Sequence, residues 1–431
     1  MRKILIASLI ASAFLSLSAQ ATDLLQTYKD ALANDPVYAS ARAALSAGQE
    51  AMPQARAGLL PNIGVSGNVS RSEVEDAGTF NTSGYTLALT QPLFRWANWQ
   101  QYEQSKLSVA ASEAQFAQAQ LDLITRVGQA YFDVLTAQDV LAFVQAQKIA
   151  ISEQLASAKR NFEVGTTTIT DTNEAQARYD LAVAQEFAAE NDLEIKRTTL
   201  EQIVGKPTTS LASLRPGLTL TLPEPAQIEP WVSSAEKQNY GVIGQEFALE
   251  IAKRDISRNR AGHMPTLDLV ASRSHTNQPS TFSTNNVTTN TNSIGVQWSV
   301  PLFSGFAVTS KVRQSIALED KARNDLESAR RSAIQGARQS YLGVSSGLSQ
   351  VKALEAAEIS SQSALDSNKL GYQVGVRINI DVLNAQQQLY STRQSLAKAR
   401  YDTIMSGLRL KSAAGTLKDE DVAQVNGLLQ Q

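Results

Sequence analysis

The sequence offers little of the chemistry that catalysis requires. Its 431 residues include two histidines, His263 and His275, and no cysteine. His263 lies at a predicted junction between a helix and a strand, and His275 lies at a strand end or in a loop. Neither histidine belongs to a metal-binding or nucleophile motif, and no Gly-x-x-x-x-Gly-Lys-Ser/Thr nucleotide loop occurs. We therefore expect no enzyme activity and no cofactor or metal.

Polar residues that could form hydrogen bonds and ion pairs gather instead at two corresponding turns. The turns begin at Gly165 and Gly375, which are 210 positions apart. Glycine adopts the left-handed conformation that commonly ends a helix. Asp171 and Asp381 follow each turn at the same offset, where a helix N-cap requires an acceptor oxygen. Each turn is therefore predicted to join two helices.

The two turns belong to a duplicated unit. Asn161-Phe162-Glu163-Val164-Gly165 corresponds to Gly371-Tyr372-Gln373-Val374-Gly375, and Gln91-Pro92-Leu93-Phe94 corresponds to Val300-Pro301-Leu302-Phe303 at an offset of 209. This period is far longer than the roughly 20–50 residues of solenoid repeats. We expect two equivalent domain-sized repeats, residues 22–205 and 231–415, joined by a proline-rich linker at 206–230.

The distribution of proline predicts long helices. No proline occurs between Pro92 and Pro207 or after Pro301, and both gaps are rich in strong helix formers. Ile124, Val127, Tyr131 and Val134 step by three and four residues, as in a coiled-coil seam. The predicted elements are two long hairpins, 97–204 and 307–414, and shorter helices at 23–57 and 231–261.

Four segments alternate apolar and polar residues over about 10 residues, the length of a tilted membrane-spanning strand. They are 62–74, 84–92, 266–275 and 293–301, joined by predicted polar loops at 75–83 and 276–292. Aromatic residues typical of a membrane interface follow them: Phe94, Trp96, Trp99, Phe303 and Phe306. Four strands cannot close a barrel, because the smallest single-chain barrels have about eight. Since open edges are unstable in lipid, several chains must share one barrel.

The ends and the charge of the chain add to this prediction. Residues 1–21 have a basic start, an apolar stretch and Ala19-Gln20-Ala21, the pattern of a cleaved signal peptide. Residues 416–431 are expected to form a C-terminal tail. The formal net charge of −2 does not indicate a nucleic-acid partner.

At these positions the chain resembles the TolC family of outer-membrane efflux and secretion channels. The resemblance extends from Thr22 to about Val422, and its most specific stretches are 161–180, 262–269, 371–385, 399–401 and 411–417. It implies a mainly α-helical homotrimer with an α-helical tunnel through the periplasm. The four strands of each chain would close a twelve-stranded barrel in the outer membrane.

The resemblance also implies a passive exit duct for a tripartite efflux pump or a type I secretion system. A periplasmic membrane-fusion adaptor would bind the hairpin tips around Gly165 and Gly375. An inner-membrane ABC or proton-driven pump would supply the energy, and outer-membrane lipid would surround the barrel.

Site residues follow from the same resemblance. Tyr372 and Arg377 match the gate positions of the second hairpin, and Thr170 and Asp171 match their partners on the first. Asp381 matches an acidic ring at the lumen constriction. The family's second acidic ring falls at Asn384, which places strong cation selectivity in doubt.

Two other hypotheses compete with the channel. A periplasmic adaptor or coiled-coil scaffold would explain the long hairpins, but it would not explain the strand pairs or the duplication. An enzyme would require a site that the two histidines do not provide.

Overall fold

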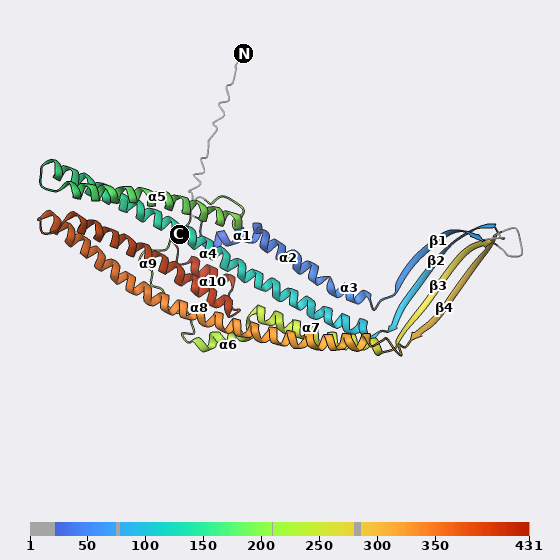
Figure 1. The fold of residues 1–431 in the computed structure, drawn as a ribbon. Helices are drawn as coiled ribbons and strands as arrows, with labels where there is room; N and C mark the ends of the chain where they lie inside the picture. Colours follow the sequence, from blue (N-terminus) through green and yellow to red (C-terminus); the bar gives the residue numbers. More distant parts are fainter. Residues whose placement is uncertain (1–21, 75–77, 209, 280–285, 431) are drawn as a thin grey trace, which may run out of the picture.

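The molecule is an elongated bundle of helices with a β-sheet at one end and two helical hairpin tips at the other (Figure 1). The computed structural model describes residues 22–74, 78–208, 210–279 and 286–430, so the predicted signal peptide lies outside the described residues. The elements in chain order are α1 (Leu24–Asn34), α2 (Pro36–Gln49), α3 (Ala51–Ala57), β1 (Asn62–Val74), β2 (Gly78–Phe94), α4 (Trp96–Glu163), α5 (Ile169–Val204), α6 (Ile228–Gln238), α7 (Tyr240–Arg260), the 3-10 turn η1 (Ala261–His263), β3 (Thr266–Pro279), β4 (Asn286–Ser299), α8 (Ala307–Gln373), α9 (Asn379–Ala413) and α10 (Asp419–Asn426).

The four strands form one antiparallel sheet in the order β1-β2-β3-β4. Both repeats therefore contribute two strands, and they meet where β2 pairs with β3. The strands are longer than predicted, because β2 begins at Gly78, β3 continues to Pro279 and β4 begins at Asn286. The expected polar loops at 75–83 and 276–292 are thus largely strand.

The register places apolar side chains on one face of the sheet and small polar side chains on the other. One row across the apolar face contains Ile63, Leu89, Ala271 and Ile294. The next position along each strand gives a row of Gly64, Ala88, Ser272 and Ser293 on the opposite face. Trp298 and Ile294 are 71% and 78% exposed, so the apolar face has no cover within the chain.

The four long arms confirm the predicted hairpins, with α4 packed on α5 and α8 packed on α9. Helix α4 has 68 residues, which corresponds to about 100 Å at 1.5 Å per residue. Gly165 and Gly375 have φ values of +77° and +79°, as the turn prediction required.

The N-cap prediction is wrong: α5 is capped by Thr168, and Asp171 occupies the third helical position. Ile378 precedes α9, so Asp381 has the same position there.

The helix predicted over 23–57 is three helices. Asp35 ends α1 and caps α2, since its side chain accepts a hydrogen bond from the Tyr38 amide. Pro36 then occupies the first turn of α2, where its missing amide hydrogen is not needed. The segment over 231–261 is also divided, at Asn239, which caps α7.

The main apolar core lies near the middle of the bundle, where α1, α4, α5, α9 and the linker meet. Tyr131 and Phe132 of α4 are almost fully buried there, and each such side chain contributes about 1.5–3 kcal/mol. The hydroxyl of Tyr131 donates to the carbonyl of Ala212 in the linker at 2.8 Å. Within the C-terminal segment, residues 416–430 include α10, and Val422 of this helix and Leu429 pack into this core.

Among the residues that the structure describes, no helix has both the length and the apolar character needed to cross a membrane.

Candidate functional site at the hairpin tips

Each hairpin tip is a tight turn closed by its own backbone. The amide of Thr166 donates to the carbonyl of Asn161, and the amide of Val376 donates to that of Gly371. On the first tip, Thr168 and Asp171 form a reciprocal capping box with bonds of 3.1 and 3.3 Å. Both turns are therefore closed by backbone hydrogen bonds, and the first is capped in addition by its own side chains.

Tyr372 joins the two hairpins within one chain. Its hydroxyl accepts a hydrogen bond of 3.2 Å from the side-chain amide of Asn161, in the last turn of α4. Arg377 lies 3.6 Å from the carboxylate of Asp381 on its own hairpin. Thr170 is exposed, and the capping box of Asp171 belongs to its own turn. The structure of one chain therefore does not bring Thr170 and Asp171 into contact with Tyr372 and Arg377.

Further polar contacts between the hairpins were not predicted from the sequence. The amide of Gln154 on α4 donates to the side-chain oxygen of Asn379, and Asn379 is only 1% exposed. Arg178 on α5 donates to Asn384 and Gln387 on α9. An asparagine or glutamine on a helix is usually solvated, so no local pattern identifies these side chains.

Apolar packing supports the polar contacts from both sides of α9. Leu383 is 2% exposed and lies in a cluster formed by α4 and α5, with Ile151 and Ala175 among its members. Its neighbour Val382 is packed with Leu365 of α8. Helix α9 thus packs against both hairpins through two neighbouring side chains.

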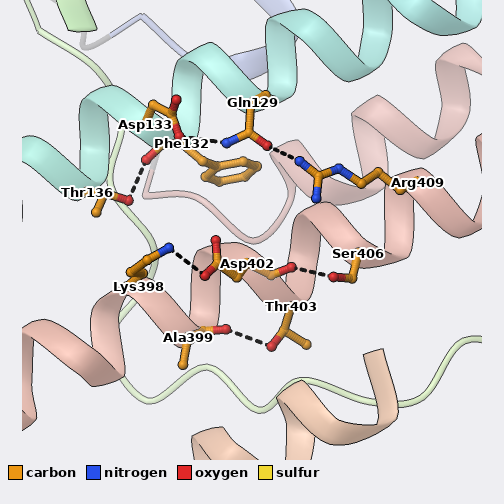
Figure 2. Close-up of polar contacts among 10 residues, drawn as sticks. All are labelled: Gln129, Phe132, Asp133, Thr136, Lys398, Ala399, Asp402, Thr403, Ser406 and Arg409. Atoms are coloured by element: carbon orange, nitrogen blue, oxygen red, sulfur yellow. Dashed lines mark hydrogen bonds and ion pairs between the residues drawn. The ribbon is translucent and has the colours of Figure 1, made fainter. Parts of the chain in front are cut away.

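A second set of contacts joins α4 to α9 nearer the middle of the molecule. Arg409 donates to Gln129 at 2.6 Å, and the ring of Phe132 lies between the same two helices (Figure 2). Tyr401 donates to Asp139 at 2.7 Å. Burial raises the pKa of the Asp139 carboxyl, and burial together with that carboxylate raises the pKa of Tyr401.

The predicted interface aromatics lie at the opposite end, where the strands meet the helices. Phe94 ends β2, Trp96 and Trp99 lie in the first turn of α4, and Phe303 and Phe306 precede α8. The rings of Phe303 and Phe306 are in an edge-to-face contact at 5.5 Å. Four of the five side chains are well exposed, and Trp96 is half-buried.

The strand-to-helix junction is fixed by an ion pair that sequence reasoning missed. Arg95, between β2 and α4, donates to both carboxylate oxygens of Asp268 at 2.8 and 2.6 Å. Asp268 is buried and faces Pro92 across the β2–β3 pair. Two parallel bonds of this kind restrict direction as well as distance, so they hold the sheet at a set angle to α4.

The two histidines form no site. His275 stacks on Tyr85 of the neighbouring strand at 5.2 Å and bonds Asn290 on the other side. His263 ends the 3-10 turn before β3. Within the described residues, no group of His, Cys, Asp and Glu side chains has an arrangement that could hold a metal.

Comparison with known proteins decides which family this architecture represents. The model of the family "Outer membrane efflux protein" matches residues 27–206 and 231–416, that is, one match in each structural repeat. The chain belongs to this outer-membrane efflux, or TolC, family. The resemblance inferred from the sequence is thus confirmed.

Individual relatives agree over nearly the full chain. "Outer membrane protein TolC" of Escherichia coli K12 is 34% identical over 97% of this chain and 87% of its own length. "Proteases secretion protein PrtF" of Dickeya chrysanthemi is 33% identical, with 96% and 92% covered. The crystal structure of the Campylobacter jejuni CmeC outer-membrane channel shares the fold, with a TM-score of 0.80 at 18% identity and coverages of 95% and 90%.

Membership in the TolC family settles the class of protein. The chain is an outer-membrane efflux or secretion channel and is not an enzyme. Its four-stranded sheet and long hairpins are the fold of this family, so the scaffold hypothesis is excluded.

Proposed function

We propose that three copies of the chain form one exit duct, with the sheets closed into a twelve-stranded barrel and the hairpins arranged as a tunnel. The unpartnered edges of the sheet support this proposal most directly. Every described side chain of β4 and most of β1 is exposed, and each of these strands pairs on one side only. An edge in lipid leaves backbone groups without partners, whereas three sheets joined edge to edge satisfy all of them.

The mass of the purified protein tests this arrangement. In mild detergent we expect a trimer by light scattering, and an unheated gel band that converts to the monomer on boiling. A monomeric particle that retains its strand signal in circular dichroism would contradict the shared barrel.

The hairpin tips are proposed as the gated periplasmic entrance. Tyr372 and Arg377 would link to Thr170 and Asp171 across neighbouring chains, in addition to the Asn161–Tyr372 bond within each chain. The tips also carry exposed apolar side chains close to Gly165 and Gly375, including Val164 (73%) and Val376 (76%). Such side chains at a turn suit docking of a periplasmic adaptor, which would bring an ABC or proton-driven pump. The cargo would be set by that pump.

Asp381 is proposed to line the constriction. Its carboxylate is half-buried beside Arg377, and the sheet face of small polar residues adds little charge further along the duct. Asp381→Asn should therefore lower the cation-to-anion permeability ratio severalfold, because it removes a charge while conserving the shape. Reversal potentials across a salt gradient measure this ratio, and Asp320→Asn, on the exposed surface of α8, is the matched control. An unchanged ratio would place the constriction elsewhere.

A further inference from the structure

We propose that Arg178 is a gating residue that ties the two hairpins of each chain together, and that Asn384 serves as its acceptor rather than as a residue of a lumen ring. This inference rests on the proposed gate at the hairpin tips. It assigns a role to a cation that the duplicated pattern and the family resemblance both left aside.

The geometry of the tie is that of a fork. One terminal nitrogen of Arg178 donates to the Gln387 side-chain oxygen at 2.5 Å, and the other donates to the Asn384 side-chain oxygen at 3.0 Å. Residues 384 and 387 are three positions apart on α9, so they present their acceptors on the same helix face. A planar guanidinium can bond both acceptors at once, which a lysine ammonium cannot do with the same directionality.

The acceptors are neutral, which distinguishes this tie from an ordinary ion pair. Within the described residues, Arg178 has no carboxylate at ion-pair distance, in contrast to Arg393 and Arg400 on α9, which pair with Glu358 and Glu355 of α8. The side-chain oxygen of Asn384 is occupied by Arg178. At the level where the family pattern has an acidic ring, this chain therefore carries a cation bound to an amide.

The surroundings of Arg178 make the tie mechanically important. Immediately further from the tip, α5 and α9 are separated by a cavity of about 390 Å³ between Val144, Gln185, Asp192 and Gln387. Gln387 both lines this cavity and accepts from Arg178. The side chains of α5 and α9 do not fill this cavity. On the side of the cavity nearer the tip, the Arg178 fork is a polar link between the two helices. Separating the hairpins would require breaking it.

Single-channel recording in planar bilayers tests the role in gating. Arg178→Ala should raise the ratio of the wide to the narrow state by about tenfold, because it removes one exposed charge-assisted link in each of the three chains. Arg178→Lys should be intermediate. In the Asn384→Ala/Gln387→Ala double variant, adding Arg178→Ala should change the population of the wide state little. The two acceptors of Arg178 are already absent there. The exposed Arg160 at the end of α4 makes no side-chain bond within the described residues, so Arg160→Ala is the matched control and should behave as wild type.

Cross-linking tests the geometry without requiring channel activity. The chain has no cysteine, so the Arg178→Cys/Asn384→Cys double variant carries a single thiol pair per chain. A short bis-maleimide should join the two within one chain, whereas Arg160→Cys with Asn384→Cys should remain unjoined. Absence of the first cross-link, or equal gating in Arg178→Ala and Arg160→Ala trimers, would overturn the tie. Wild-type protein that forms no channels in the bilayer would instead overturn the proposed duct and leave no gate for Arg178 to act on.

Discussion

Combining Tyr372→Phe with Arg377→Ser is expected to open the periplasmic entrance and to raise the single-channel conductance strongly. Tyr372→Phe deletes the acceptor of the Asn161 bond and conserves the ring that packs with Leu365 and Val382. Arg377→Ser removes the cation that faces Asp381 at 3.6 Å, together with its proposed link to the neighbouring chain. The two changes therefore act on bonds and leave the apolar packing intact.

Threefold symmetry makes the effect large. An exposed hydrogen bond or ion pair contributes about 1 kcal/mol or less. A loss of about 1 kcal/mol in each of three chains amounts to about 3 kcal/mol per trimer, which changes a two-state ratio by about 100-fold. Each single variant should fall between the wild type and the double variant. Planar-bilayer conductance measures this directly, and a double variant with wild-type conductance would remove these residues from the gate.

Replacing Gly415 with alanine is expected to destabilise the fold strongly for the addition of a single methyl group. Gly415 follows α9 with a φ of +70°, a conformation that costs an alanine about 1–2 kcal/mol. A Cβ at this position would also lie 2.1 Å from the carbonyl oxygen of Gln238 and 2.6 Å from its carbon. Because backbone atoms cannot rotate away, the junction between α6 and α7 would have to move off the end of α9.

The cost of that movement includes the bonds that hold the junction. Asn239 donates to the carbonyl of Ala413, and Ser234 donates to that of Ala414. Gly217→Ala is the matched control, since Gly217 has a φ of +72° but nothing lies within 4 Å of the place that its new methyl group would occupy. The temperature at which the trimer band converts to the monomer on a gel measures this. It should be slightly lower for Gly217→Ala than for wild type, and far lower for Gly415→Ala than for either. Equal behaviour of the two variants would show that the clash relaxes without cost.

Much of this architecture could be predicted because its signals are local and repeated. The hairpin turns need glycine at positions 165 and 375, and proline is absent where the long helices run. The lengths of the strands were harder to predict from the sequence. Above the apolar band the sheet continues through polar segments such as Thr288-Thr289-Asn290-Thr291, which pair with β3 through backbone bonds that do not depend on apolar alternation. The β-branched threonines there are the signal that could have extended the prediction.

The candidate site was also predictable only in part. The turns are predictable, yet the sequence favours Asp171 over Thr168 as the cap of α5, because both residue types suit an N-cap and only the structure shows that Asp171 occupies the third helical position. The Asn161–Tyr372 and Arg178–Asn384 bonds join residues more than 200 positions apart. Such pairs depend on how the hairpins lean together, which no local pattern specifies. Pairs between chains remain predictions.

The position of α9 between the two hairpins has a consequence for the speed and the form of opening. Val382 and Leu383 are consecutive, so on a helix of 3.6 residues per turn they point about 100° apart, one towards α8 and one into the seam of α4 and α5. A rotation of α9 that improves one contact withdraws a buried side chain from the other. Angles between the observed position, in which both side chains are buried, and an open one therefore expose apolar surface without compensation. We expect current records to show abrupt steps between discrete levels rather than a gradual widening.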